Sequence, residues 1–462
     1  MNTAIQTSKT LSLLLLGMLA SLFLNPASVF AAEEKLAPAV EAFFKSDNEF
    51  IQKTILPNIE KHRKGDARLR IFSPEGKPIG AQKISVKLRR HKFHFGCAPR
   101  AELSKDGPYR KAWSDIWEYA VPENSQKWYR IEPTEGKLNY RVSDAIVDFL
   151  KANDYAVEYH FLAGYHPKWI AEKSDEDKAR LQKAHMLRTV KRYHKRIDYF
   201  QVYNEFWRLP VSKAKAFVEP KAFFEQLVKE YPNVKFGVSD CWRLNERLPK
   251  PDEISQRFPG VDYIALHAHA PRRLWVEPKV IYQCFEPYRN SKIKLHVTEF
   301  GIREGIISRA DTLSQEWSKS FEQKGVTKGQ VWTEELKAQY FVQTLMTCFS
   351  HPSVRAFCFW GMGPGNMFMD GNRLIKDDYT RLETYKALCS LIQTKLRTRK
   401  TGTIDKTGHF AFRGYYGQYV LTLTNKAGAP VKVKFDLTPD KKNFTFTYDP
   451  ASGSLKPAEP SK

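Results

Sequence analysis

The most informative run in this sequence is Asp198-Tyr-Phe-Gln-Val-Tyr-Asn-Glu-Phe-Trp-Arg208. Its first half is aromatic and β-branched over a length that is typical of a buried strand. The strand ends on Asn204-Glu205, so an amide and a carboxylate follow its carboxyl end. In a (β/α)8 barrel the carboxyl ends of the strands form the mouth that holds the active site, so both side chains are candidates for chemistry.

A second carboxylate has the same local context in Lys294-Leu-His-Val-Thr-Glu-Phe-Gly301, where an apolar strand leads to Glu299. Two glutamates at the ends of two parallel strands supply what glycoside cleavage needs, a proton donor and a nucleophile or base. The sequence therefore predicts Glu205 and Glu299 as a catalytic pair. The alternatives are a surface ion pair between Glu205 and Arg208 and a structural salt bridge at Glu299.

The middle of the chain alternates between expected strands and expected helices, which indicates a parallel sheet. The expected strands are 93–97, 116–121, 156–162, the opening run at 199–203, 234–238, 263–267, 293–298 and 354–360. Eight strands that alternate with helices over about 300 residues fit a closed barrel. The predicted fold is therefore of the α/β class, a (β/α)8 TIM barrel over residues 93–395.

Shorter segments flank the predicted barrel. Residues 32–65 carry apolar residues at helical spacing and form an expected helical lead-in. Residues 66–92 alternate as a small β-hairpin region before the barrel, and residues 396–450 have the pattern of a small antiparallel β module. Residues 451–462 are rich in Pro, Ser and Lys, which predicts a disordered tail.

The first residues have the pattern of a secretory signal peptide. Lys9 supplies a short positive region, Leu11 to Leu24 is apolar, and small residues precede an expected cleavage site after Ala31. Residues 1–31 are therefore predicted to be removed from a secreted or periplasmic, cell-envelope protein. The alternative is that this segment stays as an anchor, and no other stretch approaches the length of a membrane span.

The formal net charge of +23 permits nucleic acid, an anionic polysaccharide or an anionic surface as a partner. No Arg/Lys run with interleaved aromatics dominates, so nucleic-acid binding is not expected. The simplest interpretation is a basic surface spread over a monomer. Aromatic residues make up 13% of the chain, which suits a sugar-binding cleft but is also explained by core packing.

The cysteines are widely spaced, which leaves open whether they are buried free thiols or form disulfides permitted by export. They are Cys97, Cys241, Cys284, Cys348, Cys358 and Cys389. The chain has neither a Cys-x2-Cys pair nor a His-Glu-x-x-His motif, so no structural zinc site and no zinc-protease site is predicted. We expect no metal and no cofactor.

Six motifs in order resemble those of family-10 glycoside hydrolases, the xylanase family, over roughly residues 66–392. They are Pro122-Glu-Asn-Ser-Gln-Lys-Trp128, Glu132-Pro-Thr-Glu-Gly136 with Asp144, Arg192-Tyr193 with Ile197 to Glu205, Leu266-His-Ala-His269, His296-Val-Thr-Glu-Phe300 and Phe359-Trp-Gly361. The resemblance implies a retaining hydrolase that cleaves internal β-1,4 linkages in xylan or a related polysaccharide. Glu205 would be the acid/base and Glu299 the nucleophile of a double displacement.

The resemblance also implies a set of sugar-contacting residues. They are Glu123, Asn124, Lys127, His160, Asn204, His267, His269 and Trp360. Asn204 would bond the sugar 2-hydroxyl, a contact that strengthens in the transition state, and His269 would keep Glu299 ionised. The structural alternative for Glu123 and Lys127 is an ion pair within the loop. For His267 and His269 it is a structural role, with their hydrogen bonds satisfied inside the barrel.

The sequence departs from the family pattern near the expected sugar contacts. Only His160 matches the family's Trp-His region, His267 replaces a Gln, Phe300 ends the nucleophile motif in place of Leu-Asp, and Phe368 would stand in for a Trp. These changes bear on which polysaccharide binds. The alternative functions are a catalytically impaired carbohydrate-binding protein on the same scaffold and a basic protein that binds the envelope surface. Arg272-Arg273 raises the hypothesis that the xylan is acidic.

Overall fold

The computed structural model describes residues 35–205, 218–242, 244, 246–269, 275–302, 305–306, 331–365, 372–425 and 427–458. The chain from Leu36 onward forms one compact unit. The predicted signal peptide, Arg208, Arg272-Arg273 and Phe368 lie outside the described residues. Within the described part of the chain, no helix is long and apolar enough to cross a bilayer.

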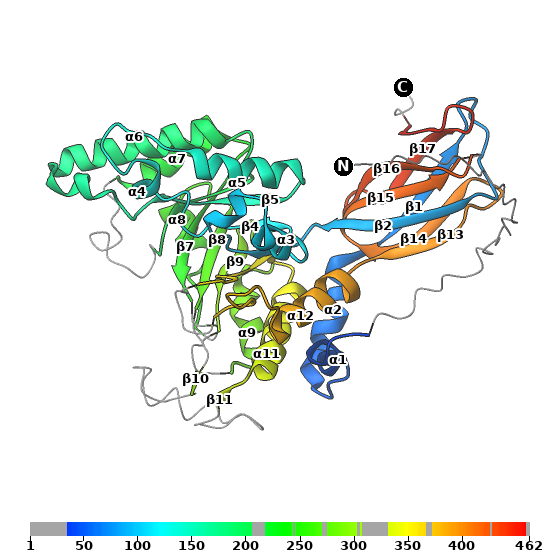
Figure 1. Ribbon diagram of the computed structural model, residues 1–462, viewed down its shortest axis with the longest axis horizontal. Coiled ribbons are helices and arrows are strands. Elements are labelled where there is room, and N and C mark those ends of the chain that lie inside the picture. The colour runs from blue at the N-terminus through cyan, green and yellow to red at the C-terminus, as the bar shows by residue number, and fades with distance from the viewer. Residues whose placement is uncertain are drawn as a thin grey trace, which may run out of the picture. The chain divides into compact units, whose positions relative to one another are not determined.

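The predicted barrel is confirmed: eight parallel strands close in the order β12-β3-β4-β5-β6-β7-β8-β9 (Figure 1). Their bounds are β3 His94–Cys97, β4 Tyr119–Ala120, β5 Ala156–Ala163, β6 Tyr199–Tyr203, β7 Lys235–Cys241, β8 Tyr263–Ala268, β9 Lys294–Phe300 and β12 Val354–Phe359. The last strand pairs with both β3 and β9, so it closes the barrel on its first strand.

Helices connect the barrel strands and pack against them. They are α3 Pro108–Ser114, α4 Trp128–Ile131, α5 Arg141–Ala152, α6 Asp175–Tyr193, α7 Pro220–Glu230, α8 Pro251–Arg257, α9 Pro278–Phe285, α11 Glu334–Ser350 and α12 Glu383–Cys389. The Ser174 hydroxyl caps α6 by accepting a hydrogen bond from the Asp177 N–H at 3.2 Å. The predicted lead-in contains α1 Pro38–Phe44 and α2 Leu56–Arg63, and a short ladder joins β10 Gly305–Ile306 to β11 Val331–Trp332.

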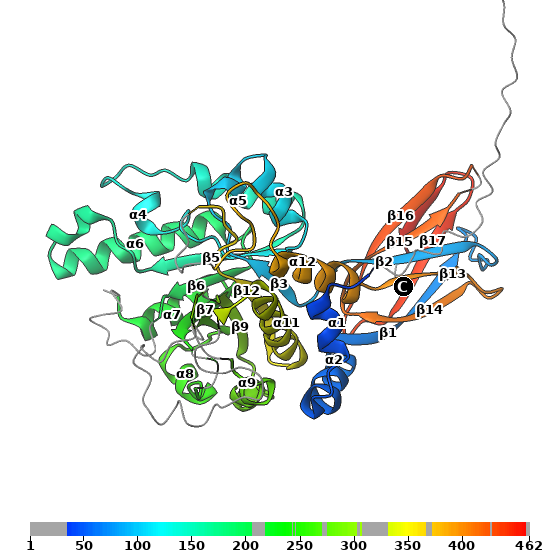
Figure 2. The ribbon, with the colours of Figure 1, turned by 60° about the horizontal axis from the view of Figure 1, so that its bottom comes forward.

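The two flanking β regions form one pair of sheets, with orders β14-β1-β17-β18 and β13-β2-β15-β16. The strands are β1 Lys64–Phe72, β2 Lys83–His91, β13 Arg399–Thr403, β14 His409–Tyr415, β15 Gly417–Thr424, β16 Pro430–Leu437, β17 Asn443–Asp449 and β18 Ser454–Pro457. In Figure 2 the blue strands β1 and β2 lie among orange and red strands from the other end of the chain. The predicted division into a hairpin region at 66–92 and a separate module at 396–450 is therefore wrong.

Pairing across the length of the chain explains this correction. β1 and β2 do not pair with each other; β1 pairs with β14 and β17, and β2 pairs with β13 and β15. A two-stranded hairpin is marginal in water, so each strand gains stability from C-terminal neighbours. The ladder between β1 and β17 is parallel, unlike the expected antiparallel module. The predicted disordered tail is also wrong at β18, which pairs with β17 and buries Leu455.

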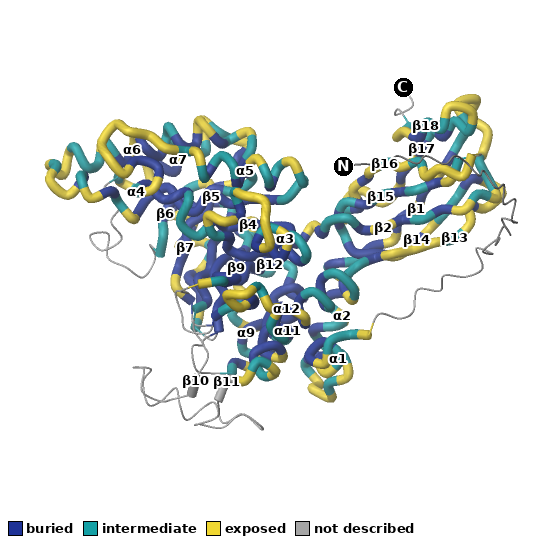
Figure 3. The backbone as a smooth tube through the Cα atoms, viewed as in Figure 1, coloured by how far each residue is buried: buried dark blue, intermediate teal, exposed yellow. Residues whose placement is uncertain are grey.

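Burial patterns distinguish the barrel strands from the flanking strands (Figure 3). β5 is buried at every position, because side chains on one face fill the barrel and those on the other meet the helices. β1 alternates between buried and exposed residues, as expected for a sheet with one face in solvent. The sequence pattern of each strand therefore matches the layer in which it lies.

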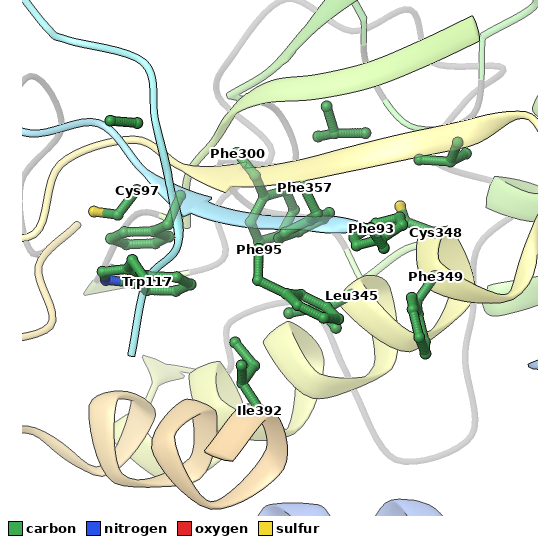
Figure 4. Packing of buried hydrophobic residues seen from close by; sticks show 14 of the residues in the cluster. Phe93, Phe95, Cys97, Trp117, Phe300, Leu345, Cys348, Phe349, Phe357 and Ile392 are labelled. Atoms are coloured by element: carbon green, nitrogen blue, oxygen red, sulfur yellow. The ribbon is translucent and has the colours of Figure 1, made fainter. Parts of the chain in front are cut away.

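Aromatic rings form much of the core between the barrel and its helices (Figure 4). Ring centroids lie 5.3 Å apart for Phe95 on β3 and Phe349 on α11. They lie 5.0 Å apart for Phe300 on β9 and Phe357 on β12. All six cysteines are free thiols, which supports the free-thiol interpretation over a disulfide framework.

Candidate active site

The carboxyl ends of the barrel strands bring the predicted site residues together. Asn204 and Glu205 follow β6, and Glu299 is the penultimate residue of β9. The other predicted residues at this end are His160 in β5, His267 in β8, His269 after β8, Trp360 after β12, and Glu123, Asn124 and Lys127 after β4. Parallel strands of a barrel all end at one mouth, so side chains that are distant in sequence meet there.

Glu299 is the more enclosed glutamate, with a side chain that is 6% exposed against 33% for Glu205. Three imidazoles contact its carboxylate. His269 Nε2 lies 2.6 Å from Oε2, and the Nε2 atoms of His160 and His267 lie 2.9 and 3.2 Å from Oε1. Burial raises the pKa of Glu299, but the three histidines outweigh burial and hold the pKa well below its usual value. Glu299 is therefore ionised at neutral pH, as a nucleophile must be.

Glu205 is held by its backbone and by one histidine. Its φ of 50° lies in the left-handed region that non-glycine residues rarely adopt. Its N–H donates to the Ser239 hydroxyl at 2.7 Å, and its Oε1 lies 3.1 Å from His267 Nδ1. The hydrogen bond with His267 outweighs burial and lowers the pKa of Glu205, and the Cys241 thiol adds to this effect.

His267 contacts both glutamates through the two nitrogens of one ring. Burial lowers the pKa of this imidazole, but the charges of Glu299 and Glu205 outweigh burial and raise the pKa. A protonated imidazole can donate one hydrogen bond to each carboxylate. The ring therefore couples the proton equilibria of the two glutamates.

Asn204 is oriented by two polar side chains. Gln201 Nε2 donates to Asn204 Oδ1 at 2.9 Å, and the Ser239 hydroxyl lies 3.4 Å from the same oxygen. The amide oxygen is therefore engaged within the protein. The amide nitrogen is the group of Asn204 that remains to donate to a ligand.

The loop after β4 places a buried lysine beside the site. Lys127 is 6% exposed, and its Nζ donates to Asn124 Oδ1 at 2.9 Å. Burial lowers the pKa of Lys127, although the charges of Glu299 and Glu123 oppose the shift. Burial also raises the pKa of Glu123. Lys127 thus bonds the amide of Asn124, and the predicted alternative of a Glu123–Lys127 ion pair is not found among the described residues.

Trp360 closes one side of the site. Its ring meets the edges of His160 and His269, with centroids 5.1 and 6.0 Å away, and it is 6% exposed. Trp128 instead stacks on His185 with centroids 4.7 Å apart and donates through Nε1 to Glu132 at 3.0 Å. Trp128 is therefore a core residue.

The structure adds residues that the sequence prediction missed. Tyr165 is 54% exposed, and Lys127 Nζ lies 4.3 Å from its ring centroid. Burial of part of the ring raises the pKa of Tyr165, and the charges of Glu205 and Glu299 contribute, which places this phenol near both glutamates. Its position in the region of the expected Trp-His pair was the available signal. Ser239, at the end of β7, carried no distinguishing signal in the sequence.

His160, His267 and Glu299 offer ligand atoms that all lie within 4.8 Å of one another. A divalent metal could bind this set of two imidazoles and one carboxylate. Such an ion would occupy Glu299 Oε1, which already contacts both imidazoles. A bound metal would therefore compete with a nucleophilic role for Glu299.

Residues 86–232 match the family model described as "Glycosyl hydrolase family 10", a segment that includes Glu205 but not Glu299. "Anti-sigma-I factor RsgI6" from Acetivibrio thermocellus is 23% identical over 410 residues, which cover 86% of this chain and 48% of that protein. "Endo-1,4-beta-xylanase 1" from Arabidopsis thaliana is 20% identical over 409 residues, which cover 84% of this chain and 40% of that protein. The chain thus spans less than half the length of these two relatives.

Solved structures of xylanases share the fold. Xylanase 10B from Thermotoga maritima aligns with 66% of this chain and 96% of its own, at a TM-score of 0.52 and 18% identity. Xylanase 10B from Thermotoga petrophila RKU-1, in complex with xylobiose, covers 66% and 95% at a TM-score of 0.51 and 18% identity. At these identities the structural likeness concerns the barrel. The family match over residues 86–232 agrees with the resemblance suggested by the motifs.

Proposed function

We propose that this chain belongs to glycosyl hydrolase family 10 and is a retaining glycoside hydrolase that cleaves internal β-1,4 linkages in xylan or a related polysaccharide. The observation that supports this most is the pair of strand-end glutamates joined by His267, with Glu299 in contact with three imidazoles. Retaining cleavage needs an ionised nucleophile and a carboxyl group that first gives and then takes a proton.

In the first step, a carboxylate oxygen of Glu299 attacks the anomeric carbon while the glycosidic bond breaks. Glu205 gives its proton to the departing oxygen, which leaves as a hydroxyl group. The greater exposure of Glu205 suits this role, because the leaving group departs and water enters on its side. The product of this step is a glycosyl ester on Glu299.

The second step reverses the role of Glu205. The negative charge of Glu299 raises the pKa of Glu205, and ester formation removes that charge. The pKa of Glu205 therefore falls after the first step, and the carboxylate can take a proton from the attacking water. The water oxygen bonds to the anomeric carbon, and Glu299 leaves as a carboxylate.

The sugar-binding part of the proposal rests on the polar groups around the glutamates. The amide nitrogen of Asn204 donates to the 2-hydroxyl of the sugar at the cleavage point, and Asn124 and Lys127 bind the neighbouring sugar. The exposed ring of Tyr165 offers an apolar face to a pyranose ring, and the buried Trp360 supports the histidines beside Glu299. The pattern in residues 1–31 supports export, so we place the protein outside the cytoplasm, secreted or in the cell envelope, acting as a monomer.

The test is sugar release from xylan and other β-glycans by the chain from Ala32 onward and by two variants. Glu205→Gln is expected to slow xylan cleavage by about 10²–10⁴-fold, and to slow an aryl xyloside with a good leaving group much less. Glu299→Gln is expected to abolish cleavage of both substrates, because no ester can form. Exposed Glu176→Gln on α6 is the matched control. Activity that survives in Glu299→Gln would reject the assignment.

A catalytically impaired carbohydrate-binding protein is the second candidate, and one observation favours it. His267 lowers the pKa of Glu205, whereas an acid catalyst needs a raised pKa. A relative at 23% identity carries the name "Anti-sigma-I factor RsgI6", which does not name a hydrolase. Saturable binding of a β-glycan by a wild-type protein that releases no sugar from any tested glycan would support this function.

A further inference from the structure

A cavity of about 680 Å³ lies at the amino ends of the barrel strands, the end opposite to Glu205 and Glu299. First residues of several strands line it, including His94 of β3, Lys235 of β7 and Lys294 of β9. The proposed hydrolase makes no use of this end of the barrel. The cavity therefore needs an explanation of its own.

The lining of this cavity is rich in cations that form no ion pair within the described part of the chain. Arg90, Lys92, Lys292, Lys294 and Arg355 all line it, and none forms an ion pair with any residue that the structure describes. Lys294 Nζ donates to the Ser291 carbonyl at 2.6 Å, an acceptor that carries no net charge. Five unpaired cations around one cavity make a strong positive potential.

Most carboxylates of the lining are already engaged. Asp198 lies 3.3 Å from Lys151 Nζ and accepts from the Val157 N–H at 3.1 Å. Asp262 lies 2.9 Å from Lys235 Nζ and accepts from the Phe236 N–H at 3.0 Å.

The remaining two carboxylates of the lining are Asp154 and Asp436. Asp154 pairs with Arg89 and lies 3.0 Å from Lys434 Nζ. Asp436 is the one lining carboxylate without an ion pair to a described residue. A single carboxylate does not balance five unpaired cations.

The charge of Arg355 acts on several groups of this lining, among them Lys92, Lys294 and His296. Arg355 is the second residue of β12 and is only partly exposed. Burial lowers the pKa of its guanidinium. Burial and the charge of Arg355 also lower the pKa of Lys92 and Lys294, although the charge of Asp440 opposes the shift at Lys92. Arg355 therefore repels both ammonium groups. Such repulsion destabilises the folded chain until an anion relieves it.

We propose that this cavity is a binding site for a tetrahedral oxyanion, a phosphate or sulfate group, held by Arg355, Lys294 and Lys92. A guanidinium offers a planar fork of N–H donors that matches oxyanion geometry, and two ammonium groups add point charges. The group arrives either as the free ion or as a substituent on a saccharide. This site and the proposed cleavage site lie at opposite ends of the barrel strands. Each assignment can therefore fail without affecting the other.

The test measures binding of inorganic phosphate and of sulfate by calorimetry and by thermal unfolding, against chloride at equal ionic strength. The wild type is expected to bind saturably and to unfold at a higher temperature with either ion. Arg355→Met and Lys294→Met are each expected to weaken binding by at least about tenfold, because each removes a charge-assisted contact. Lys221→Met, an exposed change of the same charge on α7, is expected to leave binding unchanged.

Thermal unfolding without an anion distinguishes lost binding from a folding defect. Without an anion, Arg355→Met is expected to unfold at the wild-type temperature or above it, because an unpaired, partly buried charge is gone. If this variant does not fold, Lys294→Met gives the decisive binding result. Binding that is absent in the wild type, or equally weakened in Lys221→Met, would overturn the proposal.

A sulfated xylo-oligosaccharide and its desulfated form distinguish the two sources of the group. Tighter binding of the sulfated saccharide than of free sulfate indicates a substituted glycan, and equal binding indicates the free ion. Both results support the site. Equal binding of the sulfated and desulfated saccharides at the same salt concentration, together with no saturable binding of free sulfate or phosphate, would contradict it, because the anionic group would then contribute nothing. Unchanged xylan cleavage in the Arg355→Met variant would show that the two ends act independently.

Discussion

His267 is central to the proposed chemistry, because its Nδ1 contacts Glu205 and its Nε2 contacts Glu299. It stands where the motif of the family has a glutamine. A glutamine side chain is not ionisable, whereas an imidazole adds a third proton to the two carboxyl groups. The substitution therefore bears on the pH at which the site works.

His267→Gln is predicted to shift the pH dependence of activity. The hydrogen bond from His267 lowers the pKa of Glu205, so its removal raises that pKa. The acid catalyst must be protonated in the free enzyme, and activity falls as pH rises through its pKa. The alkaline limb of the kcat/KM profile is therefore expected to move to higher pH in His267→Gln. An unmoved alkaline limb would show that His267 does not set the pKa of Glu205.

Glu158, on β5, is predicted to make stability depend on pH. It is fully buried and accepts from the Tyr119 hydroxyl at 2.5 Å, and burial raises its pKa from 4.5 to about 7. The folded state therefore binds this proton more tightly than the unfolded state does. The stability that protonation of Glu158 adds is complete below pH 4.5 and is lost as pH rises through about 7. Across this pH range the wild type is expected to lose roughly 3 kcal/mol of stability that the Glu158→Gln variant does not lose.

Chemical denaturation at a series of pH values measures this effect. The stability of the wild type relative to Glu158→Gln is expected to decrease as pH rises across the window. Exposed Glu176→Gln on α6 serves as the control. Parallel curves for the wild type and Glu158→Gln would contradict a raised pKa.

Individual residues of the site were predictable to different degrees. Glu205 and Glu299 stand out because a polar residue follows an apolar strand in each case, and His269 does lie 2.6 Å from Glu299. Their catalytic roles remain predictions. Ser239 and Gln201 were not predictable, because they position Glu205 and Asn204 through contacts that exist only after the strands assemble.

At the scale of elements, a buried ion pair joins the segment before β4 to the segment before β13. Arg397 and Glu118 contact each other and are 4% and 7% exposed. Arg397 also donates to the Arg89 carbonyl at 2.9 Å, and the His91 N–H donates to Glu118 at 3.2 Å. This pair therefore ties β2 and the start of β13 to the barrel.

Arg397→Met is predicted to destabilise the protein by about 3–5 kcal/mol, because it leaves the Glu118 charge buried without its partner. The double variant with Glu118→Gln is expected to recover part of the loss. Lys386→Met, which breaks an exposed pair with Glu383 on α12, is expected to cost about 0–1 kcal/mol. Denaturant unfolding measures all three changes. Equal small effects for both ion pairs would contradict the importance of the buried one.

At the scale of the whole molecule, strands from both ends of the chain share the two flanking sheets. The barrel was predictable because each strand and helix shows its own period in the sequence. The sheet partners of β1 and β2 were not, because short alternating strands specify a face but not a neighbour, and these partners lie more than 300 residues away. The same lack of local signal hid β18 in the predicted tail.

Truncation after Lys395 is predicted to destabilise the protein severely. Among the described strands, it removes all those that pair with β1 and β2, and it exposes buried faces that include Leu69 and Val86. The truncated chain is expected to aggregate on expression or to unfold at a markedly lower temperature, because unpaired apolar edge strands associate. A soluble truncated chain with the wild-type melting temperature would show that the barrel does not depend on these sheets.

The most direct measurement is mass spectrometry of the protein after reaction with a 2-fluoro xylobioside that carries a good leaving group. The fluorine slows both steps, and the good leaving group lets the ester form faster than it hydrolyses. The proposed mechanism predicts a mass increase of one 2-fluoro-xylobiosyl unit, located on the peptide that contains Glu299 and absent in Glu299→Gln. An unmodified protein that still binds xylo-oligosaccharides, or an adduct on another residue, would contradict the assignment of Glu299 as the nucleophile.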